Sequence, residues 1–330
     1  MKPILALTMG DVNGVGPEIL AKVLTRPEVW TVCRPIVFGS AETLRETQGA
    51  VKRRPTPVRV NDVAEAQSDA EAVPVFDGGI EAPTRRPGAL DAAAGRCAVE
   101  WFKLAVRCAM AQSVDGIVTC PLNKTGIHAA GYAYAGHTEI LAETTASPDC
   151  RMGLFSDTMR IVHVSGHCAL RDAIDKISAA RVAASIRMGH DALIRLGAPA
   201  RRIAVAGLNP HAGEDGAFGA EERDDILPAI EQCRREGIDC SGPHPADTVF
   251  LRMQAGAFDL TVAMYHDQGH IPLKLIAMDQ GVNVTLGIPI VRTSVDHGTA
   301  YDIAGKNVAR DGSLWAAIRL AAAFAARERK

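Results

Sequence analysis

The stretch PILALTMGDVNGVGPEI (residues 3–19) joins an apolar run to a glycine-bearing turn and then to the start of a helix. The run has the length of a strand, and Pro17 beside Glu18 is typical of a first helical turn. Continuous apolar runs of this kind suit strands covered on both faces, as in a parallel sheet. Further runs follow along the chain: RPIVFGS (34–40), PVRVN (57–61), DGIVTCPLN (115–123), RIVHVSG (160–166), RRIAVAGLN (201–209), FDLTVAMYHD (258–267) and GVNVTLGIPIV (281–291).

Segments with helical spacing lie between these runs. The clearest are 90–111 and 169–196, the second ending at the stop signal Gly197. SLWAAIRLAAAFAARERK (313–330) predicts an amphipathic helix packed on the sheet, with a basic end that suits the helix dipole. Alternating strands and helices predict the α/β class, and a chain of 330 residues is expected to form two domains.

The composition is that of an ordinary globular protein, with a formal net charge of −2. This balance argues against nucleic acid or an anionic membrane as the main partner, because both favour a basic surface. A small anionic substrate needs only a local cluster. The eight cysteines form no CxxC pair, and no signal peptide or membrane helix is expected, so the sequence predicts a cytoplasmic protein with reduced thiols.

The turn within 8–19 has two interpretations. Its glycines do not fit GxGxxG, so the dinucleotide fingerprint of the Rossmann fold is absent. The simpler interpretation is a tight connection from strand to helix. The functional one is close approach of the backbone to a ligand phosphate or a nicotinamide ring, and it also accounts for Asp11 at the strand end.

Three histidines stand where apolar runs stop: His167, His211 and His266. In α/β sheets, ligands bind beyond the carboxyl ends of the strands, so these ends are expected to converge on one cleft. Separations of 44 and 55 residues match no local zinc motif, and any single histidine is more often an ordinary loop residue. Together, with carboxylates nearby, the three can form an open site for a divalent metal.

His270 follows His266 by four residues, the spacing of one helix face. Gly269 and Pro272 instead favour a loop there. His270 is therefore not predicted to be a metal ligand.

An anion-binding set is also indicated. GHTEIL (136–141) offers His137 and Thr138 at the start of a helical pattern, where N–H groups and the dipole favour a phosphate. The later apolar runs are interrupted or followed by three polar residues, Lys274, Asn283 and Arg292. Each is individually ordinary, but Lys274 follows a run that is too apolar for a surface loop.

DHGTAYDIAGK (296–306) is a turn that carries Asp296, His297 and Asp302. A carboxylate in such a turn can bond both hydroxyls of a ribose, which disfavours a 2′-phosphate. The alternative is a polar loop closed by Asp and Gly.

These motifs together resemble the 4-hydroxythreonine-4-phosphate dehydrogenase family of vitamin B6 biosynthesis, whose fold is like that of isocitrate and isopropylmalate dehydrogenases. The resemblance runs from residue 8 to about residue 305. The matching stretches are TMGDVNGVGPEI, TCPLNK, GHTE, LNPHAGEDGAFGAEE, PADTVF, YHDQGHIPLK and GVNVTLGIPIVRTSVDHGTAYDIAG.

The resemblance implies two α/β domains flanking a cleft. Residues 1–125 with 290–330 would form the cofactor-side domain with both termini, and 126–289 would carry the metal site, the substrate site and the dimer interface. The enzyme would be a homodimer whose active site is shared across that interface.

The resemblance also assigns residues. His167, His211 and His266 would hold one divalent metal (Zn, Mg or Co), at least one histidine coming from the partner chain. His137, Thr138, Lys274, Asn283 and Arg292 would bind the phosphorylated substrate. The cofactor, NAD or NADP, is expected near Asp11, Gly14, His297 and Asp302, and Asp247 and Asp267 are candidates for a base or for an orienter of a ligand.

The implied reaction is oxidation of the C3 hydroxyl of 4-hydroxythreonine 4-phosphate, helped by the metal as a Lewis acid, followed by decarboxylation to 3-amino-2-oxopropyl phosphate. TCPLNKTGIHAAGYAYAGHTEIL (119–141) is also similar to paralogues that act on 4-phospho-D-threonate or 4-phospho-D-erythronate, so these substrates stay open. Two other classes remain as alternatives: a metal-dependent hydrolase or lyase, and a non-catalytic protein that binds phosphorylated metabolites.

Overall fold

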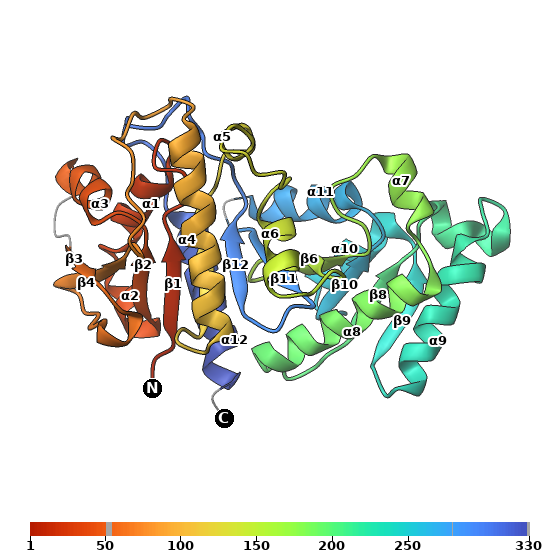
Figure 1. The fold of residues 1–330 in the computed structure, drawn as a ribbon. Helices are drawn as coiled ribbons and strands as arrows, with labels where there is room; N and C mark the ends of the chain where they lie inside the picture. The colour runs from red at the N-terminus through yellow and green to blue at the C-terminus, as the bar shows by residue number, and fades with distance from the viewer. Residues whose placement is uncertain (51–54, 279, 329–330) are drawn as a thin grey trace. The chain divides into compact units, whose positions relative to one another are not determined.

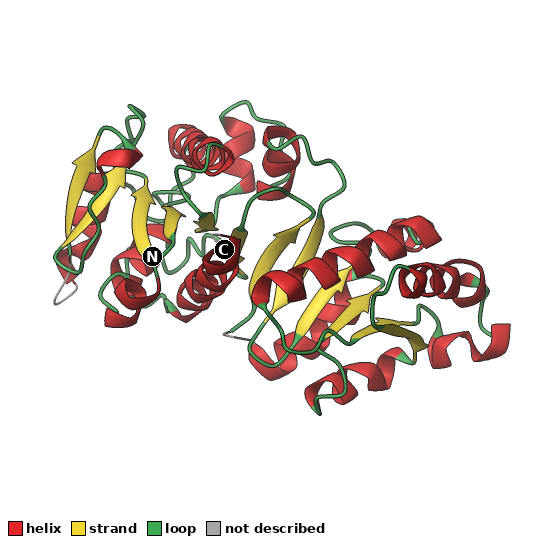
Figure 2. Cartoon of the chain, turned by 90° about the horizontal axis from the view of Figure 1, so that it is seen from below, coloured by secondary structure: helices red, strands yellow, loops and turns green. Residues whose placement is uncertain are grey.

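The computed structural model describes residues 1–50, 55–278 and 280–328. Two units build the chain: the first comprises 1–149 with 288–330, and the second comprises 150–287. In both units helices pack on strands (Figure 1), and helices lie on both faces of the sheets (Figure 2). The α/β class predicted from the alternating pattern is therefore confirmed.

The described strands of the first unit run in the order β3-β4-β2-β1-β5-β12, and all neighbours in this series are parallel. The apolar side chains of β1, β2, β5 and β12 are buried, as expected for strands covered on both faces, whereas β3 is largely exposed. The strands are β1 (Ile4–Thr8), β2 (Arg34–Phe38), β3 (Thr56–Val60), β4 (Ala72–Phe76), β5 (Gly116–Thr119) and β12 (Arg292–Val295). The helices of this unit are α1 (Gly16–Val23), α2 (Pro27–Val32), α3 (Ala41–Thr47), α4 (Ala92–Met110), α5 (Lys124–Ala129), α6 (His137–Thr144) and α12 (Gly312–Glu328), with short turns η1 (Gln48–Ala50) and η2 (Val63–Glu65).

The order in which strands are added to this sheet reverses at β1. From β1 it builds β2, β3 and β4 on one side, and then it returns to place β5 on the other side. The loops after β1 and β5 meet there, because Asp11 N donates to Pro121 O at 3.0 Å. Gly10 has a φ of +69°, and a Cβ added to it would lie 2.2 Å from Pro121 O. Such a reversal point is where α/β sheets bind ligands.

Helix α4 confirms the helix predicted over 90–111. Its N-cap Asp91 accepts from Ala93 N at 2.7 Å, and its Trp101 and Phe102 side chains are fully buried. Helices α5 and α6 pack on α4, where Tyr132 donates to the Glu100 carboxylate at 2.5 Å. Residues 126–149, which the sequence analysis assigns to the middle domain, therefore pack within the first unit.

Helix α12 likewise matches the predicted C-terminal helix and packs on β12, β5 and β1. In the described parts of the chain, no helix combines the length and the apolar character needed to cross a bilayer.

The second unit has the strand order β11-β6-β7-β10-β8-β9 among its described residues. The first two pairings are antiparallel and the remaining three are parallel. The strands are β6 (Arg151–Phe155), β7 (Arg160–His163), β8 (Ile203–Ala206), β9 (Cys240–His244), β10 (Leu260–Ala263) and β11 (Val282–Leu286). Its helices are α7 (Leu170–Asp175), α8 (Ala179–Leu196), α9 (Leu227–Arg235), α10 (Ala246–Gln254) and α11 (His266–Ala277), with the turn η3 (Pro210–Gly216) and the short π-helix η4 (Glu222–Ile226).

The helix predicted over 169–196 is divided into α7 and α8. Ser178 caps α8, because its hydroxyl accepts from Arg181 N at 3.3 Å. The end of α8 agrees with the prediction: Gly197 adopts a left-handed φ of +66° as its C-cap.

The loop predicted after His266 is wrong, because this segment is helix α11, with Pro272 inside it. Gly269 is required there for packing: a Cβ would lie 2.5 Å from His163 Nε2, so only a glycine lets α11 sit directly on β7. Leu273 and Ala277 anchor the rest of α11 in the core of the unit. This tertiary burial outweighs the hydrogen bond lost at Pro272.

Candidate active site

The parallel strands β7, β10 and β8 are neighbours in the second unit. His167 lies in the loop after β7, His266 opens α11 after β10, and His211 lies in the turn after β8. The sheet thus carries the three predicted histidines beyond the carboxyl ends of adjacent strands.

Two of these histidines come together. The ring centroids of His167 and His266 are 4.9 Å apart. They line a pocket of about 250 Å³. The pocket residues are Gly166, His167, Cys168, Leu170, Ala173, Tyr265, His266 and Asp267.

Asp267 fixes the state of the His266 ring. Its Oδ1 lies 2.6 Å from His266 Nδ1, and this contact lowers the pKa of the Asp267 carboxyl. A carboxylate accepts a hydrogen bond, so His266 Nδ1 is the donor, and in the neutral ring Nε2 then carries the lone pair. This is the arrangement by which a carboxylate orients a metal-binding histidine.

Two further histidines, His270 and His163, lie next to His266. The His270 ring stacks on His266 with centroids 3.7 Å apart, and its Nδ1 lies 3.2 Å from His163 Nε2. Burial lowers the pKa of His163 to about 3, with the neighbouring His270 acting in the same direction. The i, i+4 spacing of His266 and His270 was the signal for this pair.

His211 lies in a strained turn. Residues 211–215 all have positive φ, between 44° and 86°, which is unfavourable for residues other than glycine. The imidazole is 69% exposed and lies 3.4 Å from a Glu214 carboxylate oxygen. Strain of this kind is characteristic of functional segments.

The buried Glu222 carboxylate holds this turn from behind. It accepts from Leu208 N and Asn209 N, each at 2.7 Å, and from the Asn209 side chain at 2.9 Å. Across the described part of one chain, no three His, Cys, Asp or Glu side chains are close enough to enclose a metal ion. The described part of a single chain therefore brings His167 and His266 together as a pair, while His211, in the same unit, is exposed to solvent.

Asp247, the other predicted acid–base candidate, is exposed in the first turn of α10. Two residues before this helix begins, the His244 ring bonds Ser241 Oγ at 2.9 Å and faces Arg252 Nη1 at 3.3 Å. The start of α10 is thus fixed, while the Asp247 carboxylate is accessible.

Predicted substrate residues of the first unit also meet. Arg292 is buried, and its Nη2 donates to Thr119 Oγ1 at 2.7 Å. Burial and then the Arg292 charge hold the pKa of His137 well below its usual range. The His137 ring packs edge-on against Phe102, with Thr138 exposed beside it at the start of α6.

The remaining two substrate candidates belong to the second unit. Lys274 projects from the exposed side of α11, and Asn283 is half-buried on β11.

Predicted cofactor residues gather at the loops after β1 and β12. The fully buried Asp11 carboxylate accepts from Tyr301 Oη at 2.6 Å and from Asn13 N at 2.9 Å, while burial raises its pKa. Gly14 lies against Thr299, where a Cβ would come within 3.0 Å. His297 and Asp302 are exposed in the loop after β12.

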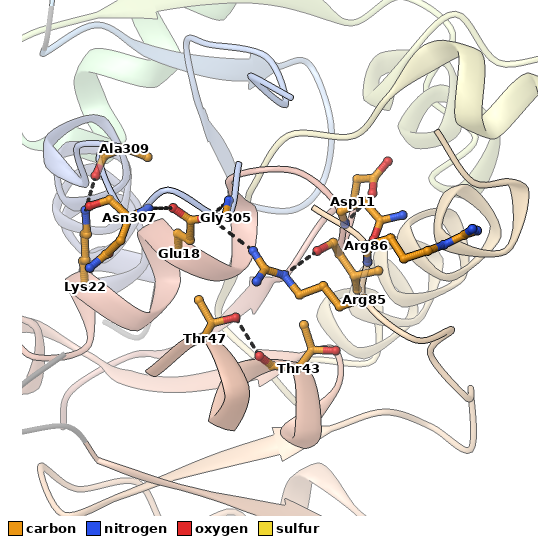
Figure 3. A network of polar contacts seen from close by, with 12 residues as sticks. Asp11, Glu18, Lys22, Thr43, Thr47, Arg85, Arg86, Gly305, Asn307 and Ala309 are labelled. Atoms are coloured by element: carbon orange, nitrogen blue, oxygen red, sulfur yellow. Dashed lines mark hydrogen bonds and ion pairs between the residues drawn. The ribbon is translucent and has the colours of Figure 1, made fainter. Parts of the chain in front are cut away.

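A second buried carboxylate, which the sequence analysis did not single out, fastens this loop (Figure 3). Glu18 on α1 accepts from Gly305 N, from Asn307 N at 3.1 Å and from Arg85 Nη2 at 3.2 Å. Lys22, one turn further along α1, donates to Asn307 O at 2.8 Å and to Ala309 O at 2.6 Å. The loop after β12 is therefore held firmly on α1.

The fold and these clusters define an α/β protein that carries a histidine pocket at the carboxyl ends of its strands. The family model described as pyridoxal phosphate biosynthetic protein PdxA matches residues 31–321, and the chain belongs to this family. A D-threonate 4-phosphate dehydrogenase of Cupriavidus necator is 44% identical over 327 residues, which cover 98% of each chain.

A 4-hydroxythreonine-4-phosphate dehydrogenase of Desulforapulum autotrophicum is 42% identical over 97% of this chain and 95% of its own length. The crystal structure of a 4-hydroxythreonine-4-phosphate dehydrogenase from Klebsiella pneumoniae superposes with a TM-score of 0.90 at 41% identity, covering 98% of both chains. The relatives thus carry dehydrogenase names with two different phosphorylated substrates.

Proposed function

We propose that this protein is a metal-assisted, nicotinamide-dependent dehydrogenase that oxidises the C3 hydroxyl of a phosphorylated four-carbon hydroxy acid, after which the resulting β-keto acid loses CO2. The observation that carries the proposal is the His167–His266 pair, with Asp267 on His266 Nδ1, beyond the carboxyl ends of β7 and β10. Hydride would leave to NAD; Asp302, in the loop after β12, is our reason to prefer NAD to NADP.

As substrate we propose D-threonate 4-phosphate first. The Cupriavidus relative with this name supports it. 4-Hydroxythreonine 4-phosphate, which the sequence analysis ranks first, is the second candidate, because the Desulforapulum relative carries that name. 4-Phospho-D-erythronate is the third.

The residues divide the work by their chemistry. His137, Thr138, Lys274, Asn283 and Arg292 are our candidates for binding the phosphorylated substrate. The buried Arg292 suits this role because a guanidinium out of water binds an anion strongly. Asp247, being accessible, is our candidate for the group that takes the hydroxyl proton.

His167 and His266 fit two ligands of a divalent cation such as Zn, Mg or Co, and Asp267 orients the second. When bound, the cation supplies Lewis-acid polarisation of the reacting oxygen. Since one chain brings only two of the three histidines together in its described part, we propose a homodimer in which His211 of a second copy completes the set.

The eight cysteines are all free thiols, which supports our proposal of a reducing, cytoplasmic location.

The test is an assay of NAD reduction at 340 nm with the three phosphorylated acids, each with and without chelator. We expect turnover of D-threonate 4-phosphate that chelator abolishes and added metal restores. His266→Ala should lose it, and His190→Ala, on α8 away from the pocket, should retain it. Turnover that survives chelation, or equal activity of His266→Ala, contradicts the metal role; product formation without NAD reduction points to the hydrolase or lyase class.

A further inference from the structure

A second imidazole lies in face-to-face contact with the His266 ring. His270 follows one helical turn later on α11, so its ring shares a helix face with His266. The two rings are nearly parallel, with planes 9° apart and centroids 3.7 Å apart. One full face of the His266 ring is therefore covered by another flat ring.

The His270 ring is itself held in plane by hydrogen bonds. His163 Nδ1 lies 3.2 Å from Met152 O, and since a carbonyl only accepts, the His163 proton sits on Nδ1. His163 Nε2 then accepts from His270 Nδ1 at 3.2 Å, and the same N–H faces His266 O at 3.1 Å. The chain of contacts leads from a backbone carbonyl of β6 to the stacked ring.

Packing leaves this arrangement little freedom. His163 is 1% exposed and His270 is 5% exposed. Gly269 lets α11 pack directly against His163, because a Cβ at this position would lie 2.5 Å from His163 Nε2. Burying polar atoms is unfavourable in itself, and a leucine at position 270 would avoid it. An imidazole differs from leucine in having a flat face whose orientation is set by hydrogen bonds.

We propose that His270 is a positioning residue: its ring, anchored by His163, holds the His266 ring in the orientation in which it binds the divalent cation. This inference rests on the proposed function, because it takes His266 as a metal ligand. His270 itself acts through His266 by stacking. A side chain that keeps a flat ring at this position should therefore keep the effect.

The experiment titrates Co²⁺ into metal-free full-length protein by calorimetry and records the visible absorption bands of bound Co²⁺. His270→Leu should weaken Co²⁺ binding by roughly tenfold or more and alter the bands, in line with the effect of residues that support metal ligands. His270→Phe keeps the ring and should bind within about threefold of the wild type. The control is His190→Leu, which replaces a half-buried histidine on α8 of the same unit. This variant should bind Co²⁺ as the wild type does.

Thermal unfolding of each metal-free variant checks that it is folded, and His270→Met replaces the leucine variant if that one does not fold. Wild-type affinity and bands in the folded leucine or methionine variant overturn the inference while the proposed function stands. Equal weakening by phenylalanine and leucine also overturns it, because a ring is then insufficient. If the wild type binds no Co²⁺, the metal role of His266 fails, and this inference fails with it.

Discussion

At the scale of single residues, the buried guanidinium of Arg292 is the group of the first unit best suited to hold an anion. It is 4% exposed and is oriented by Thr119. We expect Arg292→Ala to raise KM for the phosphorylated substrate by about tenfold or more, since a charge-assisted contact is lost, with a smaller change in kcat. Steady-state kinetics check this, with the exposed Arg107→Ala as control. An unchanged KM would remove Arg292 from the phosphate site.

His137 gives a pH prediction. Its pKa in the folded protein lies well below the usual 6.5. Between these two pKa values, His137 binds a proton in the unfolded chain but not in the folded protein. Its contribution to the free energy of unfolding is therefore fully present above pH 6.5 and falls as the pH is lowered. Urea unfolding at pH 7.5 and 5.5 should show this loss, and it should be smaller in His137→Gln. The same slope in both proteins would contradict the assignment.

Some residues of the candidate site could be predicted from the sequence and others could not. His167 and His266 were found because polar residues at strand ends converge whatever the details of packing. His270 was excluded because Gly269 and Pro272 are local loop signals. These residues lie in a helix because Gly269 packs closely against His163. The two residues are more than 100 positions apart, so no local sequence pattern could indicate this contact.

At the scale of elements, the strained turn η3 depends on one carboxylate. Glu222→Ala would leave Leu208 N and Asn209 N without their acceptor, which costs about 1–3 kcal/mol for each buried group. We expect a loss of about 3 kcal/mol in the free energy of unfolding. Urea denaturation measures it, with Glu221→Ala as control, because Glu221 contacts only the Asn209 side chain among these groups. Equal stability of the two variants would show that the turn does not need Glu222.

The loop after β12 gives a second prediction at this scale. Glu18→Gln removes the negative charge that holds Gly305 N, Asn307 N and Arg85 on α1. If this loop binds the cofactor, KM for NAD should rise several-fold while KM for the phosphorylated acid stays nearly constant. Kinetics with each substrate varied in turn separate the two. If only KM for the phosphorylated acid rises, the loop after β12 does not bind the cofactor.

Strands were predictable where Val and Ile follow one another closely. The runs became β1, β2, β3, β5, β7, β8, β10 and β11 as expected, although β3 is largely exposed. No strand was predicted for β6 or β9, whose sequences are RMGLF and CSGPH. β9 is the last strand of its series, where Gly and Pro are tolerated, and so it lacks the apolar pattern.

At the scale of the whole molecule, the proposed dimer has a candidate surface. Ile271, Leu275 and Met278 on or just after α11 are 57–81% exposed, and Leu170 on α7 is 58% exposed. Apolar side chains gathered in this way favour a protein partner. We expect Leu275→Glu to convert a dimer to monomers in light scattering and to lower activity. Leu90→Glu, an equally apolar exposed site of the first unit, should change neither; a wild-type monomer with full activity would exclude the shared site.

The strand pairing of the second unit has a consequence for how the unit can be exchanged. Arg151 pairs with Leu286 across β6 and β11, so the chain enters and leaves this unit at adjacent points. The segment 150–287 is thus continuous in sequence, with two ends that a short connection can join. It can be grafted between relatives as a cassette, which would reveal whether substrate preference travels with the histidines or stays with the recipient scaffold.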